Sequence, residues 1–221
     1  MERTVTIRAG SAALQGDLSI PEPASGERER EDSGLVIFAH GSGSSRHSPR
    51  NRAVAGMLRT HGIGTLLLDL LTSEEEVIDQ RTGELRFDVP RLSGRLVDTV
   101  DQVSEWEQTR ARAIGLFGAS TGAAAALVAA AERPRLVRAV VSRGGRPDLA
   151  KDRLPQVCAP TLLIVGGADS QVLGLNQDAA RRLSAALVDL RVIPGAGHLF
   201  TEPGALEQVA DWAAEWFVGR L

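Results

Sequence analysis

A serine between two glycines, Ser120 in the pentapeptide GASTG at 118–122, lies at the junction of two unlike segments. Residues 113–117 are typical of a buried strand, and residues 121–131 of a closely packed helix. A serine on so sharp a strand-to-helix turn adopts a strained backbone conformation that exposes its hydroxyl. Its neighbours must be small because larger side chains would collide across the turn. The pattern predicts a nucleophile; a plain glycine-rich turn is the alternative.

Two further residues able to take part in this chemistry follow later apolar runs. Asp169 comes shortly after residues 161–165, and His198 shortly after residues 188–193. Parallel strands end at one edge of a sheet, and ligands bind beyond that edge. A serine hydroxyl needs a base, and an imidazole base needs an anion to fix its tautomer. We therefore predict a catalytic triad in which His198 is the base for Ser120 and Asp169 orients His198.

Each of these residues also has a simpler interpretation. Asp169 could cap a helix, and His198 could be an ordinary loop histidine. Asp148, which follows the run at 136–141, is a rival for the acid, or else an ordinary residue at a helix start. The order serine, aspartate, histidine at successive strand ends favours the triad with Asp169.

Acyl transfer also needs hydrogen-bond donors for the oxyanion that forms on the carbonyl. We predict the backbone N–H groups of Thr121 and Ser42, with Gly41 next to Ser42 also close to the substrate. The loop at 40–45 is rich in glycine and serine, so its main chain can approach a ligand. A phosphate cradle is the alternative, but the lysine and spacing of a P-loop are missing. His40 is expected to support this loop structurally.

The surrounding elements alternate between strand and helix. This alternation predicts an α/β fold with a mostly parallel central sheet covered by helices on both faces. A hairpin at 5–8 and 13–20 and a solvated connection at 21–32 precede it. Strands are expected at 35–39, 65–69, 113–117, 136–141, 161–165 and 188–193, and helices at 48–60, from Pro90, at 121–131, at 177–187 and from Gly204.

The size and composition of the chain exclude several classes of protein. Its 221 residues suit one domain spanning 1–221, and a net charge of -3 without a basic stripe argues against nucleic acid. With Cys158 as its single cysteine, the chain cannot form an intrachain disulfide, which is typical of a reducing compartment. We expect Cys158 to be buried as a small hydrophobic residue. No signal-like or membrane-spanning run occurs, so we expect a soluble cytoplasmic protein without cofactor or metal. A homodimer is compatible with the sequence.

Four motifs together resemble the α/β-hydrolase superfamily, and within it the small dienelactone-hydrolase-like branch. They are FAHGSG at 38–43, the pentapeptide around Ser120, GAD at 167–169 and GH at 197–198. Residues 40–51 also resemble bacterial hydrolases that occur alone or fused to a phosphoribosyltransferase-type domain. We do not expect such a domain within residues 1–221. The resemblance implies a hydrolase. Dienelactone hydrolase itself uses a cysteine nucleophile, so a serine here favours ordinary esters over lactones.

The substrate is expected to be a small-molecule ester with a short acyl group. Residues 142–160 are too few for a cap domain, so the site should be shallow and walled by residues 70–89. The chain has no tyrosine and few aromatic residues to line a large apolar groove. Acyl transfer, thioester cleavage or perhydrolysis would use the same triad, and a non-catalytic binding protein is a further alternative.

Four arginines are candidates for the rim of the site: Arg46, Arg50, Arg143 and Arg146. They could bind a carboxylate or phosphate of the substrate through bidentate contacts. Ordinary surface arginines are the alternative. We predict Gly41, Arg46 and Arg143 as substrate-binding residues.

Overall fold

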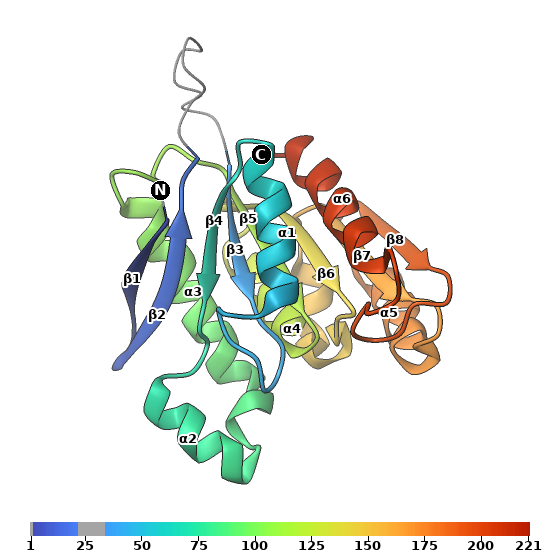
Figure 1. Ribbon diagram of the computed structural model, residues 1–221, viewed down its shortest axis with the longest axis horizontal. Helices are drawn as coiled ribbons and strands as arrows, with labels where there is room; N and C mark the ends of the chain where they lie inside the picture. The colour runs from blue at the N-terminus through green and yellow to red at the C-terminus, as the bar shows by residue number, and fades with distance from the viewer. Residues whose placement is uncertain (1, 22–33) are drawn as a thin grey trace.

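The computed structural model describes residues 2–21 and 34–221. In these residues eight strands form one sheet in the order β1-β2-β4-β3-β5-β6-β7-β8 (Figure 1). The hairpin β1–β2 joins β4 in antiparallel fashion, and all other neighbours are parallel. The strands are β1 (Glu2–Ala9), β2 (Ala12–Ser19), β3 (Leu35–Ala39), β4 (Gly64–Leu68), β5 (Ile114–Ala119), β6 (Val137–Arg143), β7 (Thr161–Gly166) and β8 (Val188–Ile193).

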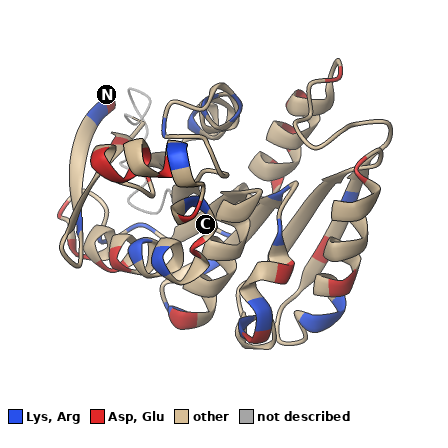
Figure 2. Cartoon of the chain, turned by 90° about the horizontal axis from the view of Figure 1, so that it is seen from below, with Lys and Arg blue, Asp and Glu red and all other residues tan. Residues whose placement is uncertain are grey.

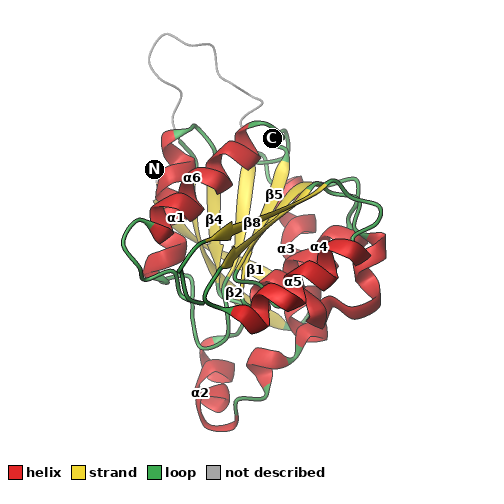
Figure 3. Ribbon diagram, turned by 90° about the vertical axis from the view of Figure 1, so that its right-hand side faces the viewer, coloured by secondary structure: helices red, strands yellow, loops and turns green. Residues whose placement is uncertain are grey.

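Helices cover both faces of this sheet (Figure 3). Helices α1 and α6 lie on one face, and α3, α4 and α5 lie on the other. The short α2 projects beyond the lower edge of the sheet in Figure 1. The helices are α1 (Pro49–Thr60), α2 (Ser73–Thr82), α3 (Val89–Glu105), α4 (Thr121–Glu132), α5 (Ser170–Arg182) and α6 (Ala205–Val218), with 3-10 segments η1 (Leu85–Phe87) and η2 (Pro147–Gln156).

The apolar strand sequences reflect burial on both faces. In β3, Leu35 and Ile37 pack toward the core under α3 and α4, whereas Val36 and Phe38 pack toward α1 and α6. Successive side chains of a strand point to opposite faces, so a strand covered on both sides is apolar at every position. Helix α4 is buried along almost its whole length, and its alanines allow both α3 and η2 to pack closely against it.

The predicted fold class is confirmed. Only η2 and short connections lie between β6 and β7, so this region holds no cap domain, as predicted. The strands β3 and β5 to β8 all end at the same edge, and the loops after them carry the candidate site residues. The predicted connection at 21–32 falls, apart from Pro21, outside the described residues. No helix of the described segments combines the length and apolar character needed to cross a membrane.

Two sequence predictions are wrong. The helix expected at 177–187 is α5, which begins at Ser170 and ends at Arg182. It begins earlier because the Asp169 carboxylate accepts a hydrogen bond from the Val172 N–H and caps the first turn. Cys158 is exposed rather than buried. It lies in a short irregular segment whose neighbours Val157 and Ala159 are directed into the core.

Phe217 of α6 provides a test of the core. Its ring lies against the backbone of β5, where a Cβ on Gly115 would be 2.6 Å from Phe217 Cε1. Phe217 is fully buried, so Phe217→Ala should lower the free energy of unfolding by about 3–5 kcal/mol. Val218→Ala, at the exposed next position, should change it by less than about 0.5 kcal/mol. Urea unfolding of both variants measures this, and equal losses would contradict the assigned packing.

Candidate active site

Ser120 occupies the sharp turn between β5 and α4. Its backbone has φ 50° and ψ -120°, a conformation that residues with a side chain rarely adopt. A Cβ on Gly118 would lie 2.4 Å from Ala123 Cα, and one on Gly122 would lie 2.3 Å from the Ala39 carbonyl oxygen. Backbone atoms cannot move aside cheaply, so both positions require glycine. The turn therefore presses the start of α4 against the end of β3.

His198 and Asp169 form a hydrogen-bonded pair beyond the ends of β8 and β7. Nδ1 of His198 lies 2.8 Å from Oδ2 of Asp169. The carboxylate holds the proton on Nδ1 and leaves Nε2 free to accept another. The two loops are also joined directly, because the Ala168 N–H donates to the Ala196 carbonyl over 2.9 Å. Imidazole and carboxylate thus have the relative geometry of a base and its orienting group.

The turn after β6 lies between the serine and the histidine. The Ser120 N–H donates to the Arg143 carbonyl over 3.2 Å. A Cβ on the adjacent Gly144 would be 3.2 Å from the His198 carbonyl oxygen. Ser120 and His198 therefore flank the same two residues, although no hydrogen bond joins their side chains in this structure. Such contacts commonly tighten only when substrate binds.

Asp148, the rival acid, does not contact His198. Its carboxylate accepts two hydrogen bonds from the Arg146 guanidinium, each of 2.8 Å. The acid that the structure places against the imidazole is Asp169.

The loop after β3 crosses close above the serine. A Cβ on Gly41 would lie 3.0 Å from Ser120 Cβ. Within the described part of the chain, no recorded backbone hydrogen bond uses the N–H of Ser42 or of Thr121. Both residues line a small pocket next to the turn, and Leu70, Leu71 and Leu92 line the same pocket. The pocket thus brings two free donors together with apolar side chains.

His40 holds this loop against the end of β4. Its Nε2 accepts the Leu70 N–H over 3.1 Å, so the ring proton is on Nδ1, which donates to the Gly41 carbonyl over 2.9 Å. Burial lowers the pKa of His40, and the hydrogen bond to Gly41 opposes this shift only in part. The ring is therefore neutral and structural, as predicted from the sequence.

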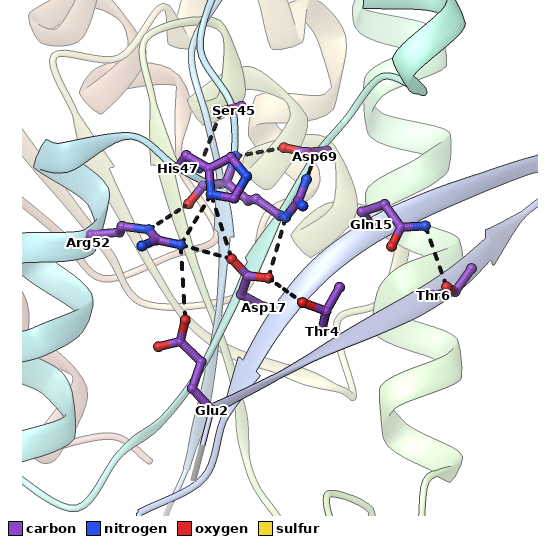
Figure 4. Close-up of polar contacts among 10 residues, drawn as sticks. Glu2, Thr4, Thr6, Gln15, Asp17, Ser45, His47, Arg52 and Asp69 are labelled. Carbon is purple, nitrogen blue, oxygen red and sulfur yellow. Dashed lines mark hydrogen bonds and ion pairs between the residues drawn. The ribbon is translucent and has the colours of Figure 1, made fainter.

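The far end of the same loop is anchored by ion pairs (Figure 4). Arg46 donates from its backbone N–H to Asp69 over 2.6 Å, and its guanidinium contacts both Asp69 and Asp17. Asp17, in β2, also accepts from Arg52 over 3.0 Å and from Thr4 over 3.1 Å. The guanidinium of Arg46 is thus occupied within the protein and ties the loop to the hairpin.

The four rim arginines separate into two pairs. Arg46 and Arg146 each contact carboxylates, whereas Arg50 and Arg143 contact none among the described residues. Figure 2 views the molecule from this edge, where acidic and basic residues alternate over the helices.

Two residues near the site were not predicted from the sequence. Glu202 accepts the Gly197 N–H over 3.0 Å and so holds the loop that carries His198. Arg86 lines the pocket and is held by the buried Asp79, with an Nε to Oδ2 distance of 2.6 Å. A charged residue four positions after His198 was the available signal for Glu202. Nothing local indicates that Asp79 and Arg86 pair.

Comparison with known proteins gives one family. Residues 49–217 match the Dienelactone hydrolase family. A "Putative phosphoribosyl transferase" of Mycobacterium tuberculosis strain H37Rv is 51% identical over 220 residues, covering 100% of this chain and 47% of that protein. The chain therefore spans about half the length of the curated relatives it matches.

Solved structures agree with this match. The crystal structure of a dienelactone hydrolase from Anabaena variabilis is 54% identical, with a TM-score of 0.94 over 100% of this chain and 98% of that one. Est1E from Butyrivibrio proteoclasticus has a TM-score of 0.79 at 16% identity, over 98% of each chain. The second similarity is one of fold alone.

The close approach of α4 to β3 can be tested with two glycines in helices. Gly122→Ala should cost about 2–3 kcal/mol of stability, because its Cβ would meet the carbonyl oxygens of Ala39 and His40. Gly174→Ala, in α5 where a Cβ meets nothing within 4 Å, should raise stability by about 0.5–1 kcal/mol. Thermal unfolding compares the two. A stable Gly122→Ala protein would show that the turn is not tightly constrained.

His40 should make stability depend on pH. Its pKa is lowered in the folded state from 6.5, so the unfolded chain takes up a proton that the folded chain refuses. The contribution of neutral His40 to the free energy of unfolding is complete above about pH 6.5. As the pH falls below that, the free energy of unfolding decreases by at most about 1.4 kcal/mol per pH unit. Urea unfolding between about pH 7.5 and about pH 5 should give a shallower slope for His40→Gln than for wild type. His61→Gln, at an exposed position, is the control, and an unchanged slope in His40→Gln would refute the assignment.

Proposed function

Because the chain belongs to the Dienelactone hydrolase family, we propose that it is a serine hydrolase that cleaves small carboxylic esters through an acyl intermediate on Ser120. The observation that carries the proposal is the strained backbone of Ser120, at φ 50° in a turn lined by obligatory glycines. Such strain costs stability and is retained where exposing a reactive group requires it. The His198–Asp169 pair beyond the neighbouring strand ends supports the same proposal.

In the proposed first step, Ser120 Oγ attacks the ester carbonyl carbon while Nε2 of His198 takes the hydroxyl proton. Asp169 holds the Nδ1 proton and stabilises the imidazolium. The N–H groups of Ser42 and Thr121 donate to the oxyanion. When this intermediate collapses, the carbon–oxygen bond to the alcohol breaks and His198 gives its proton to the departing oxygen.

The second step returns the enzyme to its starting state. A water molecule gives a proton to Nε2 of His198 and attacks the acyl carbon. The bond to Ser120 Oγ then breaks, His198 reprotonates the serine, and the carboxylic acid is released. No cofactor or metal is required for either step.

The surroundings of the serine favour short acyl groups. The pocket beside the turn is lined in part by Leu70, Leu71 and Leu92, and η2 is too short to build a cap over it. A serine nucleophile favours ordinary esters over the lactones that give the family its name. The proposal concerns these 221 residues, since the Mycobacterium tuberculosis relatives are about twice as long.

Hydrolysis of p-nitrophenyl esters from acetate to decanoate tests the proposal. Wild type should be most active on the shortest chains, and Ser120→Ala should reduce kcat by at least about 10⁴-fold. Ser42→Ala is the matched control, because it keeps the backbone N–H and should retain activity within a few-fold. A fluorophosphonate should label wild type and not Ser120→Ala.

Other outcomes would redirect the assignment. Activity that rises with chain length would mean that a longer acyl groove exists. Labelling of Ser120 without ester hydrolysis would favour thioester cleavage, acyl transfer or perhydrolysis with the same triad. Folded protein that is neither labelled nor active would refute the proposal and favour a binding protein.

A further inference from the structure

Arg143, the last residue of β6, is a buried cation next to the serine turn. In the sheet it is paired with Ala119, the residue before Ser120. Its relative exposure is 7%, and its Nε is buried without a hydrogen-bond acceptor. The guanidinium lies 5.8 Å from the ring centre of Phe200, two residues after His198. A guanidinium buried without an acceptor is costly unless something else satisfies it.

Arg50, in the first turn of α1, is only partly buried as a residue but resembles Arg143 in one respect. Its Nε is also buried and unpaired, and no carboxylate of the described residues contacts it. The first turn of α1 contains no acidic residue. Since the N-terminus of a helix carries partial positive charge, an arginine there adds repulsion where an acid would normally be favoured.

The two arginines repel each other. Burial, and then the charge of Arg50, lower the pKa of Arg143 to about 10, so Arg143 remains protonated near neutral pH. By contrast, Arg46 and Arg146 at the same edge are neutralised by carboxylates. Of the four rim arginines, Arg143 and Arg50 are thus the two without a carboxylate partner among the described residues.

Stacking on Phe200 does not account for this arrangement. A cation–π contact at 5.8 Å would stabilise Arg143 alone, and it would leave the N–H donors unsatisfied. It also gives no reason for Arg50. A bound anion would satisfy the donors of both guanidinium groups together.

We propose that Arg143 and Arg50 form a subsite for an oxyanion, a carboxylate or a phosphate, carried by the ester substrate. This inference rests on the proposed function and names its substrate class: esters with an anionic group on the acyl or the alcohol side. Arg143 and Arg50 then set specificity, and the chemistry is left to Ser120, His198 and Asp169.

Two matched pairs of esters test the subsite. Mono-p-nitrophenyl adipate and p-nitrophenyl hexanoate differ in charge on the acyl side, and 4-carboxyphenyl acetate and 4-carbamoylphenyl acetate differ on the alcohol side. For at least one pair, Arg143→Gln should lower the anionic-to-neutral ratio of kcat/KM by about tenfold or more. Arg50→Gln should lower the same ratio, and it provides the test if Arg143→Gln does not fold. Arg146→Gln is the control and should leave the ratio unchanged.

Inhibition of p-nitrophenyl hexanoate hydrolysis distinguishes the two anions. Competition by adipate that is lost in Arg50→Gln would assign a carboxylate, and the same result with inorganic phosphate would assign a phosphate. Unchanged ratios for both pairs in both variants, with active wild type, would overturn the subsite alone. Absence of hydrolysis of all four esters in wild type would instead refute the proposed function, and this inference with it.

Discussion

The contact between the start of α4 and the end of β3 is the constraint on which the candidate site depends. Gly122 lies so close to the carbonyl oxygens of Ala39 and His40 that no side chain fits between them. This approach forces Ser120 into its strained turn and brings the loop after β3 over the serine. One steric condition therefore brings Ser120 together with the N–H groups of Ser42 and Thr121. The buried, alanine-rich α4 makes such an approach geometrically feasible.

Polar contacts at this edge have mainly a positioning role. His40 fastens the start of the loop after β3, and Arg46 fastens its far end through Asp69 and Asp17. Asp169 accepts hydrogen bonds from both His198 Nδ1 and the Val172 N–H. A single carboxylate therefore orients the imidazole and caps the start of α5. Because each of these polar groups is hydrogen-bonded or ion-paired within the protein, the loops keep one arrangement without a cap domain.

The sequence allowed prediction of those features that depend on local patterns and on the order of strand ends. Ser120, Asp169 and His198 fall in this class, because a sharp turn and parallel topology place them at one edge. The partners of the arginines could not be predicted, since Arg46 and Asp17 are 29 positions apart in the sequence and only the fold brings them together. The start of α5 was predicted too late because capping by Asp169 was treated as an alternative to its contact with His198, whereas the carboxylate makes both.

The way α2 is attached has a consequence for access to the serine. Val77 and Ile78 of α2 are both 53% exposed, so apolar packing contributes little to holding this helix. It is tethered mainly by Glu75, which accepts from Arg95 over 2.6 and 2.7 Å and has its pKa lowered to about 2 by that hydrogen bond. The side chains of Arg95 and Glu75 are only 10% and 19% exposed, so salt screens this ion pair much less than one at the surface. The position of α2 beside the pocket thus depends on polar partners, Glu75 with Arg95 and Asp79 with Arg86, and not on the apolar packing that holds the sheet.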